Sequence, residues 1–316
     1  MNGGRVGTPA LLATNQPEHA MGGNLVTGIG LDGRVAIVTG AGGGLGRSHA
    51  LALAARGAKV VVNDLRGAGP PAAAVVDEIV ATGGEAVADG ASVADPRGAT
   101  GMVERALDAF GRVDVLVNNA GILRDRSFAK MSEPEFREVL EVHLLGAYHL
   151  TAAAWPHLKA QGYGRVVNTT SPAGLFGNFG QANYSAAKMA LVGFTRTLAI
   201  EGRKAGIHVN VVAPLAASRM TETILPAEAL AKLDPRHVSP LVVYLASETC
   251  PHTGGVFTAG GGYVGRVAVV QAPGVVLDEV TPEALAQRWS AVTDVSGGHE
   301  FPGGAAEQGD WVLAQV

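Results

Sequence analysis

Tyr184 and Lys188 are the residues of this chain whose types and spacing are best suited to chemistry. They lie in the stretch from Gln181 to Glu201, where apolar residues recur near the helical period. Residues four apart on a helix lie one above the other on the same face. An ammonium beside a phenol favours the phenolate and lowers a pKa that is ordinarily about 10. The pair alone also fits an ordinary surface contact, but it predicts a tyrosine that exchanges a proton with an alcohol or carbonyl.

The elements that must position this pair alternate between strand and helix from Arg34 onward. Short apolar runs predict strands at 35–38, 59–63, 85–88, 113–117, 165–168, 208–212 and 255–258. Helices are predicted at 45–56, 72–82, 95–110, 132–161, 181–201 and 240–247. A further strand at 266–270 and a helix at 281–289 capped by Thr281 follow.

Such alternation requires a parallel sheet with helices on both faces. The predicted fold is therefore α/β, a single Rossmann-type doubly wound domain with a seven-stranded parallel sheet over residues 29–265. Residues 1–28 are expected to form a flexible N-terminal leader. Residues 266–316 are expected to form a C-terminal extension of the same domain.

A glycine-rich turn, Thr39-Gly-Ala-Gly-Gly-Gly-Leu-Gly46, follows the first strand and opens a helix. Glycines let a backbone approach a pyrophosphate, and a helix N-terminus stabilises its charge. Asp64 ends the second strand, where a carboxylate binds the ribose hydroxyls and repels a 2′-phosphate. This favours NAD over NADP, with Arg47 and Arg66 nearby as the opposing signal.

The chain's composition excludes several other classes of function. A net charge of −4 without a basic block argues against nucleic acid or an anionic membrane as the main partner. Cys250 is the single cysteine, so an internal disulfide is impossible and a reducing compartment fits. No apolar stretch approaches the length of a membrane span, and a soluble, cytoplasmic protein is expected. The three histidines of the 132–161 helix lack metal-ligand spacing, so no metal site is expected.

Four motifs in order and spacing resemble the short-chain dehydrogenase/reductases from about residue 31 to 265: the glycine turn, Asn118-Asn-Ala-Gly121, Ser171 and Tyr184-x-x-x-Lys188. Residues 121–128, 177–188 and 199–204 are similar to one branch. That branch comprises the (3R)-hydroxyacyl-CoA dehydrogenase domains of peroxisomal multifunctional enzymes type 2. The resemblance also covers Ser218-Arg-Met-Thr221 and the glycine-rich residues 260–265.

The resemblance implies a set of site residues. The implied catalytic residues are Ser171, Tyr184, Lys188 and His143, and Ser171 and Tyr184 also contact the substrate. The implied cofactor-binding residues are Gly40, Gly44, Leu45, Gly46, Asp64, Asn118, Ala120, Gly121, Tyr184, Lys188, Ala216, Ala217, Ser218 and Arg219. His143 takes the position where most family members carry an asparagine of a water relay to the lysine. The relay then runs through His143 or is altered.

The resemblance further implies NAD-dependent oxidation of a 3-hydroxyacyl-CoA by a homodimer or homotetramer, with Tyr184 as general base. Because the chain ends at Val316, without a hydratase domain, a stand-alone dehydrogenase is expected. A fatty acyl group and a steroid-derived side chain both fit. The alternatives are a hydroxysteroid dehydrogenase, a 3-ketoacyl reductase of the same fold, and a non-catalytic dinucleotide-binding sensor. Asp64 opposes an NADPH-dependent reductase, and the Ser171, Tyr184 and Lys188 set opposes a sensor.

Overall fold

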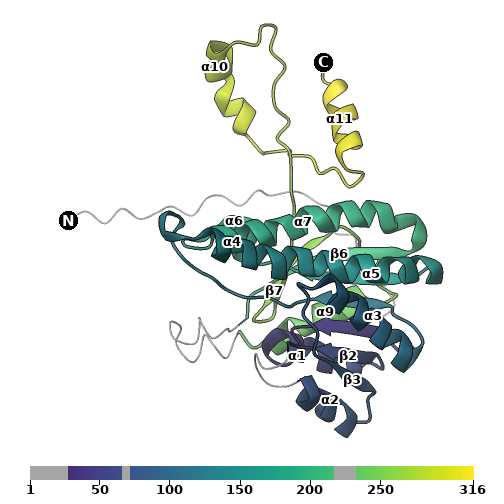
Figure 1. The fold of residues 1–316 in the computed structure, drawn as a ribbon. Helices are drawn as coiled ribbons and strands as arrows, with labels where there is room; N and C mark the ends of the chain where they lie inside the picture. Colours follow the sequence, from purple (N-terminus) through teal and green to yellow (C-terminus); the bar gives the residue numbers. More distant parts are fainter. Residues whose placement is uncertain (1–27, 66–71, 217–232) are drawn as a thin grey trace. The chain divides into compact units, whose positions relative to one another are not determined.

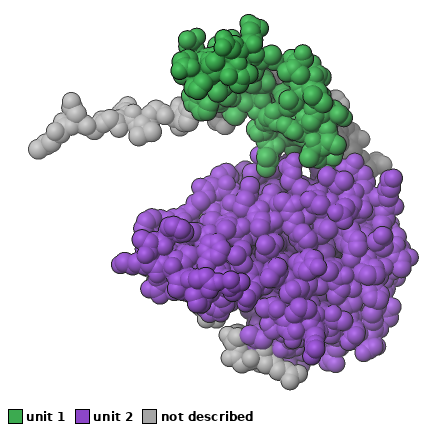
Figure 2. Space-filling view, turned by 45° about the horizontal axis from the view of Figure 1, so that its top comes forward, with its two compact units in different colours: residues 1–28, 269–316 green, residues 29–268 purple. Residues whose placement is uncertain are grey.

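The computed structural model describes residues 28–65, 72–216 and 233–316. Within the described chain, contacts define two compact units, Ile29–Ala268 and Val269–Val316, which Figure 2 colours separately. The predicted leader, residues 1–28, lies outside the described residues except for Gly28. The assignment of residues 266–316 to the first domain stays a prediction.

One sheet of eight strands forms the centre of the first unit, in the order β3-β2-β1-β4-β5-β6-β7-β8. Figure 1 draws the fold of the chain as a ribbon. The strands are β1 Val35–Thr39, β2 Lys59–Asn63, β3 Ala86–Asp89, β4 Val115–Asn118, β5 Gly164–Thr169, β6 Ile207–Pro214, β7 Val256–Gly260 and β8 Tyr263–Val267. The first seven pair in parallel, which confirms the predicted doubly wound sheet. The strand order reverses between β1 and β4, and ligands of such sheets bind at this point, outside the carboxyl ends of the strands.

The eighth strand was predicted in the wrong place. A strand at 266–270 was expected, but β8 begins at Tyr263 and pairs antiparallel with β7. The two residues between these strands, Gly261 and Gly262, have φ angles of 61° and 84°. Two successive positive φ angles make a two-residue hairpin turn, a conformation that glycine adopts readily.

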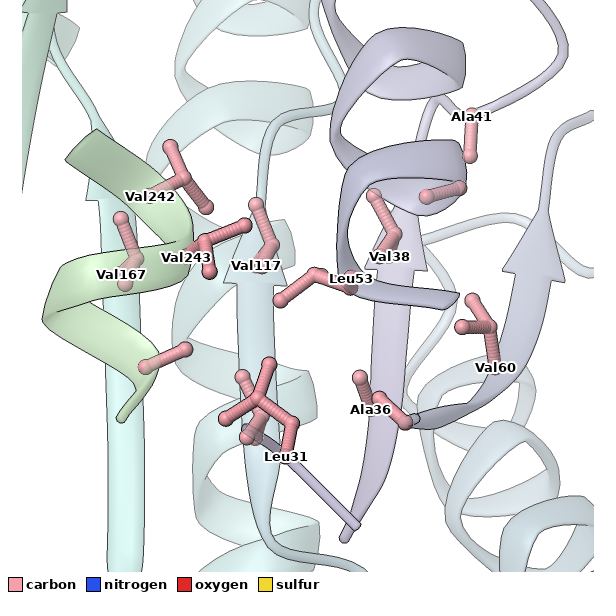
Figure 3. Packing of buried hydrophobic residues seen from close by; sticks show 14 of the residues in the cluster. Leu31, Ala36, Val38, Ala41, Leu53, Val60, Val117, Val167, Val242 and Val243 are labelled. Atoms are coloured by element: carbon pink, nitrogen blue, oxygen red, sulfur yellow. The ribbon is translucent and has the colours of Figure 1, made fainter. Parts of the chain in front are cut away.

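Helices cover both faces of the sheet because alternate strand residues point to opposite sides. Ala36 and Val38 of β1 join a buried cluster with residues of α1 Gly44–Ala54, α2 Ala72–Ala81 and α9 Ser239–Ala246. Figure 3 shows this cluster, in which Leu53 of α1 and Val242 of α9 lie beside strand valines. Val35 and Ile37 join a second cluster with α3 Pro96–Phe110, α5 Gly146–Gln161 and α7 Ala182–Gly202.

The long helix predicted over residues 132–161 is interrupted. Its start is confirmed, since Ser132 and Glu135 form the predicted capping box at the beginning of α4, Glu133–Leu140. A π-helical segment, Glu141–Leu145, then joins α4 to α5. Such π-turns are rare and frequently occur at functional sites. This one carries His143.

The end of the sheet opposite the strands' carboxyl ends is held by a buried carboxylate. Asp114 is fully buried, and its Oδ2 accepts a hydrogen bond from the backbone amide of Val35 at 2.9 Å. Arg34 and Arg112 donate to the same carboxylate, at 3.2 Å and at 2.6–2.8 Å. The buried carboxylate of Asp114 is therefore compensated by two arginines and a backbone amide.

The second unit holds two helices, α10 Pro282–Thr293 and α11 Ala305–Leu313. The side chain of Thr281 accepts a hydrogen bond from the amide of Ala284 at 3.1 Å, so the predicted cap is confirmed. No helix among the described residues has the length and apolar character needed to cross a bilayer.

Candidate active site

The glycine turn between β1 and α1 depends on glycine through positive φ angles and through close packing at Gly40 and Gly46. Gly40 and Gly44 have φ angles of 63° and 51°. A Cβ on Gly46 would lie 2.1 Å from the carbonyl oxygen of Gly40. Leu45, which precedes Gly46, is partly buried and packs against the core. The turn leaves its backbone open to a pyrophosphate at the start of α1, which is the fit expected for a dinucleotide.

Asp64 lies beside this turn, as predicted. Its Oδ2 accepts a hydrogen bond from the amide of Gly42 at 2.7 Å. Arg47, a potential ligand for a 2′-phosphate, is paired instead with Glu78 of α2 through two contacts, one of them Nε to Oε1 at 3.0 Å. Arg66 lies outside the described residues.

The Asn118-Asn-Ala-Gly121 motif fastens the strands around the cofactor end. The Nδ2 of Asn118 donates to Thr151 at 3.2 Å and to Asn168 of β5 at 2.8 Å. The Nδ2 of Asn119 donates to the carbonyl oxygen of Thr39 at 2.9 Å. Because the side chain of Asn118 is engaged within the protein, a cofactor contact from this residue would have to use its backbone.

Ser171, Tyr184 and Lys188 come together at the carboxyl end of β5. Ser171 caps α6, Pro172–Phe176, by accepting a hydrogen bond from the amide of Ala173 at 3.2 Å. Lys188 is only 3% exposed, and its Nζ donates to the carbonyl oxygen of Thr169 at 2.5 Å. The same Nζ lies 5.6 Å from the centre of the Tyr184 ring. The side chains of Ser171 and Tyr184 form a hydrogen bond.

The protonation of this pair differs from the sequence-based prediction. Burial raises the pKa of Tyr184, a hydrogen bond with Ser171 lowers it, and the charge of Asp125 raises it further. Burial also lowers the pKa of Lys188 from 10.5 to about 7, which weakens its positive charge near neutral pH. The predicted lowering of the Tyr184 pKa by Lys188 is therefore absent from this structure, where the net effect of burial prevails.

His143 packs directly against the catalytic candidates. Its ring meets that of Tyr184 edge to face, with 5.2 Å between the centroids. Its Nε2 lies 2.8 Å from the carbonyl oxygen of Ile122, and within the described chain its buried Nδ1 has no hydrogen-bond partner. Burial, and then the charge of Lys188, lower the pKa of His143 to about 3, so the ring is neutral at pH 7. A Cβ on Gly121 would lie 2.2 Å from this ring, so the ring requires glycine there.

Comparison with known proteins identifies the family that has this arrangement. The family model described as short chain dehydrogenase matches residues 34–228. The chain belongs to the short-chain dehydrogenase/reductase family. It is therefore an oxidoreductase of the kind that acts on CH–OH groups. Hydroxyacyl-CoA dehydrogenases and 3-oxoacyl reductases are among its relatives.

Three similar proteins each cover most of this chain. A short-chain type dehydrogenase/reductase of Mycobacterium tuberculosis is 53% identical over 85% of this chain and 96% of its own. The mouse peroxisomal multifunctional enzyme type 2 is 50% identical over 84% of this chain. The structure of the full-length enzyme from Drosophila melanogaster has a TM-score of 0.78 at 43% identity, covering 91% of this chain. This chain spans 37% of the mouse enzyme and 50% of the Drosophila one.

The structure describes some of the remaining predicted cofactor-binding residues of this short-chain dehydrogenase and not others. Ala120 and Gly121 follow β4 beside the glycine turn, and Ala216 packs against the core beyond β6. Ala217, Ser218 and Arg219 lie outside the described residues. Within the described chain, no group of three or more histidine, cysteine, aspartate or glutamate side chains is placed to hold a metal ion.

One contact at the site was not predicted from the sequence. Gln181, at the start of α7, donates from Nε2 to Oδ2 of Asp125 at 2.7 Å. Asp125 also acts on the pKa of Tyr184. Gln181 and Asp125 are 56 positions apart in the sequence, and no sequence pattern indicates that they are in contact.

Proposed function

We propose that the protein oxidises a (3R)-hydroxyacyl-CoA to the 3-ketoacyl-CoA with NAD, using Tyr184 as the general base. The observation that carries this proposal is the convergence of Ser171, Tyr184 and Lys188 at the end of β5, in a sheet whose glycine turn fits a dinucleotide. Relatives named as hydroxyacyl-CoA dehydrogenases and peroxisomal multifunctional enzymes support the acyl thioester as substrate.

In the proposed reaction, the substrate's 3-hydroxyl lies between the Ser171 hydroxyl and the Tyr184 phenolate. Tyr184 takes the hydroxyl proton while hydride leaves C3, so that the alcohol becomes a carbonyl. Bound NAD supplies the acceptor for that hydride and a positive charge that favours the phenolate. Ser171 donates a hydrogen bond to the reacting oxygen and stabilises its developing charge. Reduction follows the same path with the phenol as acid.

Lys188 and His143 complete the proposed proton path. With a pKa of about 7, Lys188 can hold or release a proton near neutral pH. The cavity that His143 and Lys188 line together with Asn118 has a volume of about 10 Å³, which is room for one water molecule. The unpaired Nδ1 of His143 is the group that can bind such a water. His143 thus serves in the proposal where most family members use an asparagine.

NAD is the proposed cofactor because of two contacts at the glycine turn. Asp64 is held there by the Gly42 amide, where its charge repels a 2′-phosphate. The charge of Arg47 is paired with Glu78. A reductase that uses NADPH would need a free cation where this structure places a carboxylate.

The state of assembly and the location of the protein are proposals as well. A homodimer or homotetramer is supported by apolar side chains exposed on α5 and α7, among them Tyr148, Met189 and Ile200. The predicted cytoplasmic location stays a prediction. The mouse and Drosophila relatives are named as peroxisomal enzymes, so the peroxisome is the competing location.

A substrate panel tests the proposed function. Purified protein is given NAD or NADP with (3R)- and (3S)-3-hydroxyacyl-CoA and with a hydroxysteroid, and NADPH with a 3-ketoacyl carrier protein. We expect NADH formation with the (3R) thioester at a rate well above the other combinations. Turnover of the steroid alone would indicate a hydroxysteroid dehydrogenase. Turnover of the carrier-protein substrate alone would indicate a 3-ketoacyl reductase. Tight binding of NAD without any turnover would assign a sensor.

A further inference from the structure

The side chains of three phenylalanines near the proposed active site are exposed to solvent. The side chains of Phe128, Phe176 and Phe179 are 79%, 74% and 90% exposed. Single exposed apolar residues are ordinary on a protein surface, whereas a group of them marks a binding site. Phe176 and Phe179 belong to the segment between Ser171 and Tyr184, so two of the rings lie between the catalytic candidates in the chain.

Phe128 joins this segment because two loops are fastened side by side. The amide of Arg126 donates to the carbonyl oxygen of Gly180 at 2.8 Å. Phe128 follows Arg126 by two residues, and Phe179 directly precedes Gly180. The Gln181 to Asp125 hydrogen bond, at 2.7 Å, fastens the same two loops one residue away. The three phenylalanines therefore belong to two loops that hydrogen bonds hold side by side.

The loops hold their shape without using the rings. The amide of Gly177 donates to Ala173 at 2.9 Å, and Asn178 donates from Nδ2 to Gln181 at 2.8 Å. Gly177 and Gly180, which flank Phe179, both have a φ of 78°. Backbone and amide hydrogen bonds fix this turn, while the ring of Phe179 is 90% exposed. Stability of the fold thus gives no reason for phenyl groups at these positions, whereas binding does.

The rings lie within reach of a substrate held at the active site. Ser171 caps α6, and Phe176 is its last residue, five positions on and about 7.5 Å away at the helical rise. A substrate whose reacting carbon lies between Ser171 and Tyr184 must extend away from these groups. An apolar chain of several methylenes that follows α6 reaches Phe176.

We propose that Phe128, Phe176 and Phe179 bind the apolar tail of the substrate and select for long acyl chains. The proposal rests on the proposed oxidation of a hydroxyacyl thioester and adds the chain length to it. We call these three residues the phenyl rim.

Both arginines beside the phenyl rim are already paired with carboxylates of the protein. Arg124, Arg126 and Lys130 are the cations of the segment between β4 and α4. Arg124 pairs with Glu138 at 2.8 Å, and Arg126 pairs with Glu135 at 2.9 Å. The charges of the two arginines are compensated by these carboxylates, and Lys130 is the further cation of this edge. An acyl chain gains from the three rings through burial, whereas a phosphate gains only from cations such as Lys130.

A chain-length series on matched variants tests the rim. The Phe176→Ser/Phe179→Ser double variant is compared with wild type and with Val80→Ser, an exposed apolar residue of α2. The readout is kcat/KM for 3-hydroxyacyl-CoA thioesters of four, eight and sixteen carbons. Each methylene buried against the rim contributes about fourfold. We expect the sixteen-to-four-carbon ratio of kcat/KM to fall at least about tenfold in the double variant and to stay unchanged in Val80→Ser.

Three results would overturn the proposal. An equal loss for every chain length would mean that the rim contacts the coenzyme A part or supports the fold. A change of oligomeric state in the double variant, measured by light scattering, would mean that the rim joins two copies of the chain. If wild type oxidises no thioester, the proposed function fails. Calorimetric binding of hexadecanoyl-CoA, weaker in the double variant than in Val80→Ser, would then still support the rim, and equal binding would refute it.

Discussion

Replacing Lys188 by methionine should remove a pH-dependent penalty on folding. Lys188 is fully buried, and burial lowers its pKa from 10.5 to about 7. Between these two values the unfolded chain binds a proton that the folded protein does not. Stability therefore rises as the pH rises from about 7 toward 10.5, and the penalty is fully present below pH 7. Methionine fills a similar volume without a charge, so the variant should lack this dependence.

The size of the effect follows from the shift. A change from 10.5 to about 7 corresponds to a penalty of roughly 5 kcal/mol at acidic pH, of which about 2 kcal/mol is relieved between pH 7 and pH 9. The methionine variant also loses the hydrogen bond from Nζ to the carbonyl oxygen of Thr169. Leaving that buried oxygen unpaired costs about 1–3 kcal/mol. A net stabilisation of about 2–4 kcal/mol is expected below pH 7.

Urea unfolding without nucleotide measures the effect. Free energies of unfolding are determined for wild type and Lys188→Met at pH 6, 7, 8 and 9. The difference between the two proteins should shrink by about 2 kcal/mol from pH 7 to pH 9, since only wild type gains stability from the loss of the Lys188 proton. Parallel pH dependences would refute the account, because Lys188 would then keep its ordinary pKa in the folded protein.

Three further predictions concern the cofactor end, the histidine and the fold. Asp64→Ala should lower the ratio of kcat/KM for NAD over NADP at least about tenfold, because the carboxylate no longer repels a 2′-phosphate; an unchanged ratio would place specificity elsewhere. Gly121→Ala should lower kcat at least about tenfold with an unchanged circular dichroism spectrum, since its Cβ displaces the His143 ring; full activity would show that this position is unimportant. Asp114→Asn should destabilise the protein by about 2–3 kcal/mol in urea, since the arginines lose a charged acceptor; an unchanged midpoint would contradict this.

The fold could be predicted because the strands are short apolar runs and several helices have an end signal of their own. Val35–Val38 is buried on both faces of the sheet, and Ser132 caps the helix that its capping box predicted. The residues that do chemistry were found through their spacing along one element. Tyr184 and Lys188 share a helix, and the glycines of the first turn share a loop.

Contacts between distant segments could not be predicted in the same way. The π-turn at Glu141–Leu145 contains neither glycine nor proline, so no residue type marks it, yet it carries His143 beside Tyr184. The pairing of Asp125 with Gln181 depends on how two loops fold together. The raised pKa of Tyr184 follows from its burial, which the position of a residue in a helix does not reveal.

The assignment of Tyr184 as the base is the central claim, and one comparison tests it most directly. NADH formation from NAD and a (3R)-3-hydroxyacyl-CoA is measured for wild type, Tyr184→Phe and Tyr263→Phe, the last an exposed tyrosine of β8. The account predicts a loss of at least about 100-fold in kcat for Tyr184→Phe, the scale of general acid–base catalysis, and wild-type activity for Tyr263→Phe. A Tyr184→Phe variant that keeps a tenth or more of the wild-type rate would contradict it.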